Sequence, residues 1–174
     1  MSAAERITFV LGGARSGKSR YAESLVTAQP PPWIFVATAE ALDQEMAQRI
    51  AEHRAHRDGR WRTIEAPCDL AAALAGVPAG AVVLIDCLTL WLSNLLLAGR
   101  DIEAEIDRLE DALMLMQGTA VLVANEVGFG IVPDNPLARR FRDLQGRLNQ
   151  RIAARADRVV LMVAGLPLFV KGHS

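Results

Sequence analysis

The sequence is poor in cysteine, in lysine and in net charge. Its two cysteines, Cys68 and Cys87, are far apart and form no CxxC pair. This argues against a disulfide framework or a zinc site, and it fits a reducing compartment. The net charge of −1 at pH 7 gives no global field that would attract nucleic acid or an anionic membrane. Arginine far outnumbers lysine, so the sequence still allows local cationic sites.

Signals for secretion or membrane insertion are also lacking. Residues 1–6 are too short and too polar for a signal peptide. Residues 80–99 are mostly apolar and nearly long enough to span a bilayer, but they include Asp86, and a carboxylate in mid-bilayer would be costly. A buried strand ending at Asp86, followed by a buried helix, explains this stretch better. We therefore expect a soluble, cytoplasmic protein with no stable membrane insertion and no nucleic-acid partner.

Short apolar runs alternate with helical patterns along the chain. The length of 174 residues predicts one domain, residues 1–174, and an apolar share of 51% suffices for a sizeable core. Predicted strands cover residues 7–11, 33–37, 61–65, 81–85, 120–124, 158–163 and 168–171, with Gly165 and Pro167 breaking the chain before the last. Predicted helices cover residues 19–27, 43–57, 101–116 and 136–156, with others after Asp69 and Asp86. The alternation predicts an α/β fold, a mostly parallel sheet with helices on both faces.

A glycine-rich loop joins the first predicted strand to the first predicted helix. Its residues are Gly12, Gly13, Ala14, Arg15, Ser16, Gly17, Lys18 and Ser19. Glycines permit a tight turn and let backbone N–H groups approach phosphate oxygens, and the helix N-terminus adds a positive partial charge. We expect Lys18 to reach the β- and γ-phosphates of a nucleotide and the Ser19 hydroxyl to bind Mg²⁺. Because a strand precedes the motif and a helix follows it, we predict a P-loop and not an accidental glycine-rich turn.

Asp86 ends the predicted strand Ala-Val-Val-Leu-Ile, at the edge where ligands of α/β folds bind. A carboxylate at this place is expected to hold Mg²⁺ directly or through water. The alternative is a cap for the helix that starts at Cys87, and both roles can hold together. We favour the metal role.

The predicted helix at 43–57 carries a histidine among arginines. Met46, Ile50 and His53 share one face of this helix, so His53 continues an inward stripe. The arginines on the adjacent faces are Arg49, Arg54 and Arg57. Such a cluster can hold a polyphosphate, and it disfavours the imidazolium, which leaves a lone pair free for attack. From helix geometry alone, a partly buried structural histidine is the better interpretation.

Several segments together resemble a known family. The first are Gly-Gly-Ala-Arg-Ser-Gly-Lys-Ser-Arg at 12–20, Ala37-Thr38, and Arg49-Ile50-x-x-His53-x-x-x-Arg57-x-x-x-Trp61-Arg62-Thr63-x-Glu65. The later ones are Asp86-Cys87-Leu88-Thr89, Asn94-Leu95-Leu96, Asn125-Glu126-Val127-Gly128, Arg139-x-Phe141-Arg142-Asp143, Gly146-x-x-Asn149-Gln150 and Ala164-Gly165. They cover nearly the whole chain in order, and the His53 segment is far more specific than the phosphate loop. The sequence resembles the bifunctional adenosylcobinamide kinase/adenosylcobinamide-phosphate guanylyltransferase family.

This resemblance implies an enzyme of cobalamin assembly with a RecA-like P-loop fold, usually a homotrimer. Such an enzyme phosphorylates adenosylcobinamide with ATP or GTP. It then transfers GMP from GTP to adenosylcobinamide phosphate through a guanylylated histidine, giving adenosylcobinamide-GDP and pyrophosphate. The position that matches this catalytic histidine is His53, whereas the neighbouring His56 does not fall on the family position.

The resemblance also implies a set of GTP contacts. Besides the loop 12–19, they are Ala37, Thr38, Ala39, Arg54, Ala55, His56, Arg57, Glu65 and Asp86. Lys18 joins His53 as an expected catalytic residue, and Ser19 and Asp86 are the expected Mg²⁺ ligands. Ala39 stands where the family often has serine.

Other residues keep two interpretations. Glu126 is a candidate base for the substrate hydroxyl, or it binds a backbone amide of its own loop. Trp61 fits the core better than a ring-stacking platform, and the cluster at 139–142 is a solvated helix face or a subunit contact. For the whole protein the alternatives are a simple P-loop kinase with a structural His53, and a non-catalytic nucleotide-binding module. A histidine ringed by arginines argues against the simple kinase, and release of pyrophosphate from GTP would separate the enzyme from the non-catalytic module.

Overall fold

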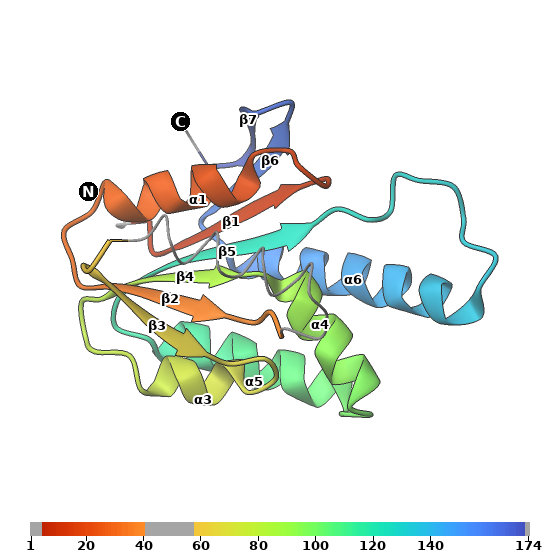
Figure 1. Cartoon of the computed structure of the whole chain (residues 1–174), viewed down its shortest axis with the longest axis horizontal. Coiled ribbons are helices and arrows are strands. Elements are labelled where there is room, and N and C mark those ends of the chain that lie inside the picture. The colour runs from red at the N-terminus through yellow and green to blue at the C-terminus, as the bar shows by residue number, and fades with distance from the viewer. Residues whose placement is uncertain (1–4, 41–57, 173–174) are drawn as a thin grey trace.

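The chain folds around one seven-stranded sheet (Figure 1). The computed structural model describes residues 5–40 and 58–172. The strands are β1 (Ile7–Gly12), β2 (Trp33–Ala37), β3 (Trp61–Glu65), β4 (Val82–Asp86), β5 (Thr119–Asn125), β6 (Arg158–Val163) and β7 (Leu166–Lys171). Their order across the sheet is β3-β2-β4-β5-β1-β6-β7, and all neighbours are parallel except the antiparallel pair β6 and β7. The predicted mostly parallel sheet is confirmed.

Helices cover both faces of this sheet. In Figure 1, α1 (Lys18–Thr27) lies above the sheet, and four other helices lie below it. These are α3 (Leu70–Ala75), α4 (Leu88–Leu97), α5 (Ile102–Leu115) and α6 (Pro136–Arg155). Along β2, Ile34 and Val36 pack with the four lower helices, whereas Trp33 and Phe35 pack with α1. Both sets are buried, as expected for strands that are covered on both faces.

Side-chain caps fix the starts of the two longest helices. Asp101 accepts a hydrogen bond from the Ala104 N–H at 3.2 Å at the start of α5. Asn135 accepts from the N–H of Leu137 at 2.8 Å at the start of α6. Pro136 then occupies the first helical position, where a missing N–H costs little. The predicted helices at 101–116 and 136–156 are confirmed with small shifts at their ends.

The apolar stretch at 80–99 divides as predicted. β4 ends at Asp86, and the largely buried helix α4 follows from Leu88. Among residues 5–40 and 58–172, no helix is both long and apolar enough to cross a membrane. The short strand predicted at 61–65 is confirmed as β3. The helix predicted at 43–57 lies outside the described residues.

The final hairpin corrects one expectation. Pro167 does not break the chain before the last strand, because it lies inside β7, opposite Met162. β7 has a neighbour on one side only, so a residue without an N–H group is tolerated there. The turn consists of Ala164 (φ 52°) and Gly165 (φ 81°), and two left-handed residues suit a tight hairpin turn.

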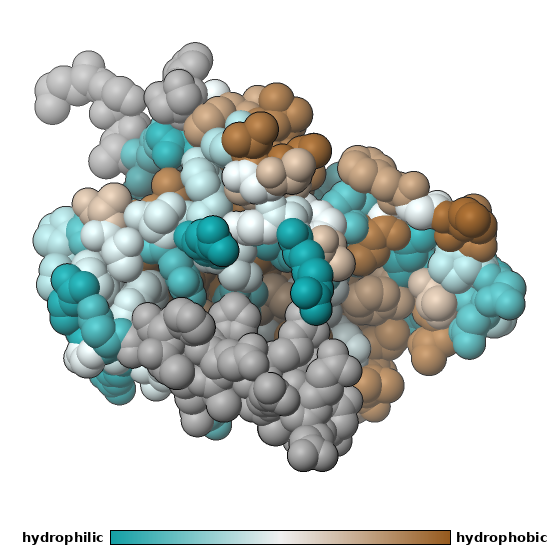
Figure 2. Space-filling model, turned by 45° about the horizontal axis from the view of Figure 1, so that its top comes forward, coloured by the Kyte–Doolittle hydropathy of each residue, from teal (hydrophilic) through white to brown (hydrophobic). Residues whose placement is uncertain are grey.

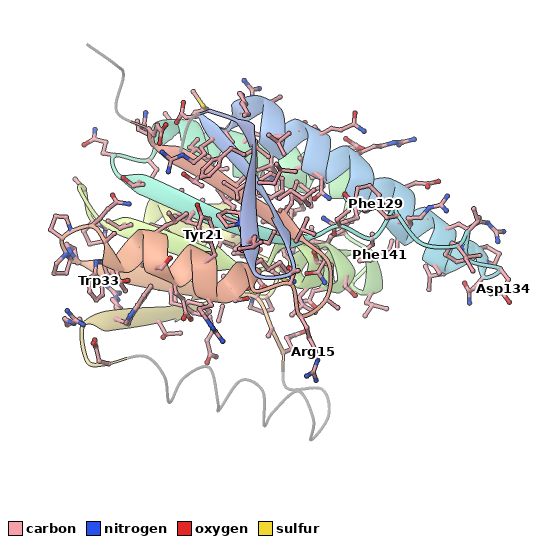
Figure 3. The ribbon with its side chains drawn as sticks, turned by 90° about the horizontal axis from the view of Figure 1, so that it is seen from above. Arg15, Tyr21, Trp33, Phe129, Asp134 and Phe141 are labelled. Atoms are coloured by element: carbon pink, nitrogen blue, oxygen red, sulfur yellow. The ribbon has the colours of Figure 1, made fainter. Side chains whose placement is uncertain are left out.

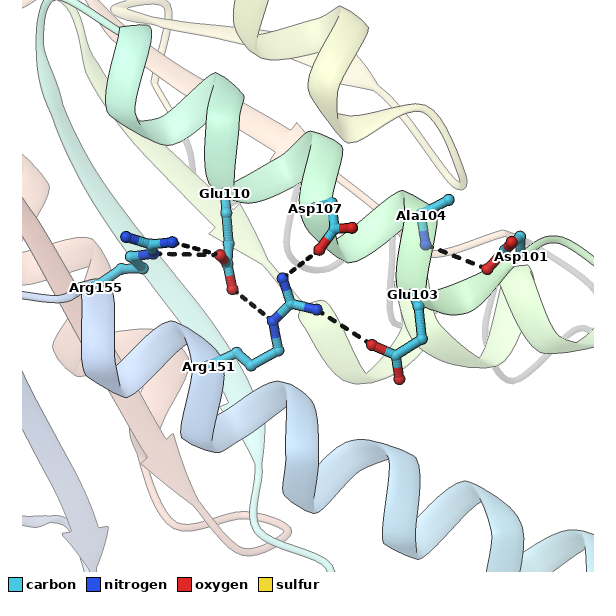
Figure 4. Close-up of polar contacts among 7 residues, drawn as sticks. All are labelled: Asp101, Glu103, Ala104, Asp107, Glu110, Arg151 and Arg155. Carbon is cyan, nitrogen blue, oxygen red and sulfur yellow. Dashed lines mark hydrogen bonds and ion pairs between the residues drawn. The ribbon is translucent and has the colours of Figure 1, made fainter.

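Two arginines of α6 bind the acidic side of α5 (Figure 4). Arg151 forms ion pairs with Asp107 at 2.5 Å, Glu110 at 2.7 Å and Glu103 at 3.2 Å. Arg155 binds Glu110 as well, at 3.0 Å. Burial would raise the pKa of the Glu110 carboxyl, but the hydrogen bonds from both arginines outweigh it and lower this pKa. The network therefore joins α5 to α6 through three carboxylates, of which Glu110 is largely buried and binds both arginines.

The strand order brings four strand ends to the same edge of the sheet. β1 is flanked by β5 and β6, and β4 is flanked by β2 and β5. Gly12 is level with Asn125, and Ala37 is level with Asp86. Ligands of such folds bind at the carboxyl ends of the strands. The predicted site residues that the structure describes lie at this edge.

Candidate nucleotide-binding site

The glycine-rich loop connects the end of β1 to the start of α1. Gly12 is the last residue of β1, and α1 begins at Lys18. Arg15 (φ 54°) and Gly17 (φ 91°) both take the left-handed conformation, which bends the loop back on itself. No side chain caps the N-terminus of α1 at Gly17. The N-terminus of a helix at the end of such a loop is where phosphate groups bind in P-loop proteins.

Close packing fixes the base of this loop. A Cβ atom at Gly12 would collide with Oγ of Ser16 and would lie 3.0 Å from the carbonyl oxygen of Met162. The Ser16 hydroxyl is buried, and it has no hydrogen-bond partner among the described residues. The Gly165 N–H donates to the carbonyl of Ser16 at 3.0 Å. The β6–β7 turn thus supports the loop from the side.

Two side chains of the loop differ in orientation. The Lys18 ammonium group donates to the carbonyl of Gly13 at 3.0 Å, so it folds back over the loop. Arg15 is exposed and extends away from the body of the molecule (Figure 3). Lys18 is therefore positioned over the region where the loop would bind phosphate, whereas Arg15 lies at its outer rim.

Asp86 is the last residue of β4 and lies at the same edge of the sheet as the phosphate loop. Burial is the main cause that raises the pKa of the Cys87 thiol to about 11. The negative charge of Asp86 adds to this rise, and the positive charge of Lys18 opposes it. Asp86 at the end of β4 and Lys18 at the start of α1 thus stand at one edge of the sheet, on either side of the end of β5. The sequence placed these residues 68 positions apart, and the sheet brings them together.

The predicted Mg²⁺ ligands, Asp86 and Ser19, lie at the end of β4 and in the first turn of α1. No group of three or more His, Cys, Asp or Glu side chains forms a metal site within residues 5–40 and 58–172. Mg²⁺ in nucleotide sites needs only one or two protein ligands, because phosphates and water complete its octahedron. Asp86 and the hydroxyl of Ser19 are the two groups that could serve as such ligands.

Thr38 and its neighbours lie at the ends of β2 and β3. The Thr38 side chain is fully buried, and its hydroxyl exchanges two hydrogen bonds with the backbone of Cys87. Ala37 accepts from the Ala66 N–H at 2.8 Å, and Glu65 is level with Ala37 in the sheet. Ala39 is half-buried beyond them. The structure therefore gathers Ala37, Thr38, Glu65 and Asp86 at adjacent strand ends.

Five predicted site residues are not placed by the structure. His53, Arg54, Ala55, His56 and Arg57 lie outside the described residues. Their expected contacts therefore stay predictions.

Glu126 follows β5 in the loop that the sequence singled out. Its Oε1 atom accepts from the Gly128 N–H at 2.6 Å, which is the backbone-amide role considered for it. Its own N–H donates to the carbonyl of Gly12 at 3.1 Å, so the glycine-rich loop and the β5–α6 loop are joined. Farther along, Arg139 donates to the carbonyls of Pro133 and Asp134 at 2.8 and 2.6 Å. Arg139, in the first turn of α6, thus binds the end of the loop between β5 and α6.

Two polar residues of α4, Thr89 and Asn94, occur in the motifs quoted above, but the sequence assigned them no role. The Thr89 hydroxyl accepts from the Asn125 N–H at 2.7 Å. The Asn94 amide donates to the carbonyls of Thr38 at 2.8 Å and Pro67 at 3.0 Å. Both are polar residues within an otherwise apolar, buried helix, and buried polar groups in such places are normally hydrogen-bonded to something specific. That contrast was the signal that could have revealed them.

Trp61 belongs to the core, as expected. Its ring contacts the ring of Trp33 with centroids 5.5 Å apart and the ring of Phe35 at 6.4 Å. It is half-buried against the cluster of apolar residues beneath α1.

Solved structures agree with this fold. The assembled ATPase EscN from the type III secretion system of enteropathogenic E. coli superposes with a TM-score of 0.60, covering 92% of this chain and 43% of that one at 11% identity. A prototypical type III secretion ATPase of pathogenic bacteria has a TM-score of 0.57, covering 90% of this chain and 50% of that one at 10% identity. At such identities the likeness concerns the fold alone. Together with the loop between β1 and α1, it defines a P-loop nucleotide-binding α/β protein.

Closer relatives narrow this class. The family model described as cobinamide kinase / cobinamide phosphate guanyltransferase matches residues 8–170. The bifunctional adenosylcobalamin biosynthesis protein CobP of Pseudomonas aeruginosa is 49% identical over 167 residues, which cover 94% of this chain and 96% of the relative. The corresponding protein CobU of Salmonella typhimurium is 43% identical over 178 residues, covering 93% and 98%. This chain belongs to the cobinamide kinase / cobinamide phosphate guanyltransferase family, as its motifs indicated.

Proposed function

We propose that this protein phosphorylates adenosylcobinamide with ATP or GTP and then transfers GMP from GTP to adenosylcobinamide phosphate. The products of the second step are adenosylcobinamide-GDP and pyrophosphate. The observation that carries the proposal is the glycine-rich loop with Lys18 folded over it, at the same edge of the sheet as Asp86, in a chain that matches the family over residues 8–170. Residues 1–174 act as a single catalytic domain in the cytoplasm.

In the kinase step, the substrate hydroxyl oxygen attacks the γ-phosphorus, and the nucleoside diphosphate departs. Lys18 and the N–H groups of the loop stabilise the charge on the transferred group. Ser19 and Asp86 would hold Mg²⁺, which would supply further positive charge to the phosphate groups. Glu126 is the candidate acceptor of the hydroxyl proton, and it would exchange its bond to the Gly128 N–H for one to the substrate.

In the guanylyl step, a neutral imidazole nitrogen of His53 attacks the α-phosphorus of GTP. A phosphorus–nitrogen bond forms as the bond to pyrophosphate breaks. An oxygen of adenosylcobinamide phosphate then attacks the same phosphorus and releases the histidine. Arg54 and Arg57 flank His53 in sequence, and neighbouring cations favour the neutral, nucleophilic imidazole. Because the transfer is split in two, the corrinoid phosphate need not meet GTP.

The test uses GTP labelled at the α-phosphate, incubated with the protein and Mg²⁺ and then denatured. We expect label on the protein that is acid-labile and base-stable, release of pyrophosphate, and loss of label in His53→Ala. GTP labelled at the γ-phosphate should leave no label on the protein but should transfer label to added adenosylcobinamide. If GTP binds and the wild-type protein gains no α-label, the chain is a simple P-loop kinase. Binding with neither transfer would indicate a non-catalytic nucleotide-binding module.

The proposal includes a homotrimer. Its support in the structure is apolar surface on the loop between β5 and α6, where Phe129 is 85% exposed and Ile131 is 97% exposed. Figure 2 shows this apolar surface at the side of the molecule, together with a second patch over the β6–β7 hairpin. Monomeric proteins seldom expose large contiguous apolar patches, so association of subunits is favoured.

A further inference from the structure

Thr38 makes an unusual pair of contacts with the residue that follows Asp86. Its Oγ1 atom accepts a hydrogen bond from the Cys87 N–H at 2.8 Å and donates one to the Cys87 carbonyl at 2.7 Å. One hydroxyl therefore satisfies both polar backbone groups of Cys87. Thr38 is 0% exposed and Cys87 is 8% exposed, so water cannot easily replace either bond.

These two bonds act directly on the chain at Asp86. Strands β2 and β4 are paired only up to Ala37 and Asp86, which are level with each other. Beyond that point the ladder ends, and the Thr38 hydroxyl replaces it with side-chain bonds to the next peptide group. The backbone on the carboxyl side of Asp86 is thereby fixed to β2.

Thr38 is itself fixed by α4. The Asn94 amide, 9% exposed, donates to the carbonyl of Thr38 at 2.8 Å and to that of Pro67 at 3.0 Å. One amide group thus binds a carbonyl just beyond the end of β2 and another just beyond the end of β3. Asn94, Thr38 and Cys87 form a continuous, buried chain of hydrogen bonds that leads to Asp86.

We propose that Thr38 is a positioning residue, which orients the carboxylate of Asp86 for Mg²⁺ through its two bonds to Cys87, with Asn94 fixing Thr38 in turn. This inference rests on the metal role proposed above for Asp86. In this role the Thr38 hydroxyl acts within the protein, because it both donates a hydrogen bond to the Cys87 carbonyl and accepts one from the Cys87 N–H. Groups that orient metal ligands typically change metal affinity by about 10- to 100-fold when they are lost.

The test measures binding of Mn²⁺, by electron paramagnetic resonance, to the protein saturated with the α,β-methylene analogue of GTP. This analogue prevents guanylyl transfer, so the readout is independent of turnover. Thr38→Val keeps the side-chain volume but removes the hydroxyl, and we expect it to weaken Mn²⁺ binding about tenfold or more. Thr38→Ser restores the hydroxyl and should recover most of the affinity.

Thr89→Val is the matched control. It makes the same chemical change at a buried threonine of the same region, but its hydroxyl binds the Asn125 N–H instead of Cys87. We expect a comparable loss of thermal stability and an unchanged Mn²⁺ affinity. If Thr38→Val does not fold, Thr38→Ala takes its place and is judged by the same comparison with Thr38→Ser.

Asp86→Asn separates the two levels of the proposal. If Asp86→Asn weakens Mn²⁺ binding and Thr38→Val does not, the positioning role is wrong while the metal role of Asp86 stands. If Asp86→Asn leaves the affinity unchanged, the metal role itself is wrong, and the inference fails with it. Equal losses in Thr38→Val and Thr89→Val would show a general structural effect and overturn the positioning role.

Discussion

Gly12 and Gly13 are neighbours in the phosphate loop, but their surroundings differ. A Cβ atom at Gly12 would collide with Ser16 and crowd the backbone of Met162, whereas nothing lies within 4 Å of a Cβ at Gly13. Only the first position therefore requires the absence of a side chain for steric reasons. The contact with Ser16 arises within the loop itself, and the contact with Met162 arises because β6 lies directly beside β1.

We expect Gly12→Ala to displace the loop and to weaken GTP binding at least tenfold. Crowding of this kind in a packed region costs about 1–3 kcal/mol of stability. Isothermal titration with GTP and thermal unfolding measure the two effects. Gly13→Ala is the control and should retain near wild-type stability; equal losses in both variants would contradict the steric explanation.

Cys87 should be chemically inert in the folded protein. Burial, with the charge of Asp86, raises the pKa of its thiol to about 11. At pH 8 the reactive thiolate would then amount to about one part in a thousand, in a side chain that reagents cannot reach. In a Cys68→Ser background, we expect an aromatic disulfide reagent at pH 8 to modify no thiol in native protein and one after addition of urea. Rapid reaction in native buffer would show that the end of β4 is open to solvent.

The phosphate loop could be predicted from sequence because its residues are contiguous and the flanking patterns are strong. The Thr38 hydroxyl could not be assigned in the same way. It binds a residue 49 positions away, and that contact exists only because β2 and β4 are neighbours in the sheet. Local patterns predict which residues lie at strand ends, but they do not predict which strand ends are adjacent.

At the scale of helices and strands, the periodic patterns located nearly every element that the structure describes. Two features escaped them. Pro167 lies within an edge strand, and the penalty for proline depends on whether a neighbour needs its N–H. The ion pairs between α5 and α6 join charges that are more than 40 residues apart, and each helix alone shows them as an ordinary polar face.

Glu110→Gln should lower the stability of the fold. Glu110 is 9% exposed and binds Arg151 and Arg155, and loss of such charged hydrogen bonds costs about 1–3 kcal/mol. Its folded pKa is lowered from 4.5, so its contribution is present above that value and is lost as pH falls through the folded pKa. Urea unfolding at pH 7 and below pH 4 should show a difference between variant and wild type that shrinks in acid. A difference that stays constant with pH would argue against an ionised Glu110.

At the scale of the whole molecule, the strand order creates the site. β5 lies between β1 and β4, so the phosphate loop and Asp86 stand on either side of one strand end. The alternation of strands and helices predicts a parallel sheet with ligands at its carboxyl edge, but several strand orders satisfy the same alternation. The order became known only from the structure.

Subunit number is testable on the same scale. We expect sedimentation equilibrium to give about three times the chain mass of 18.9 kDa. Ile131→Ser, which changes a 97% exposed side chain, should weaken association if the β5–α6 loop lies in the interface. A wild-type protein that sediments as 18.9 kDa at micromolar concentration would contradict the trimer.

The hydrogen bond from the Gly165 N–H to the carbonyl of Ser16 connects the phosphate loop, near the start of the chain, to the β6–β7 turn, near its end. A protease that clips the chain within the last ten residues would leave the phosphate loop covalently intact but would free the hairpin that supports it. Nucleotide affinity should then decay with C-terminal trimming long before the fold is lost. A preparation that contains both intact and clipped chains would then bind less than one GTP per chain. Intact-mass spectrometry would identify the clipped chains.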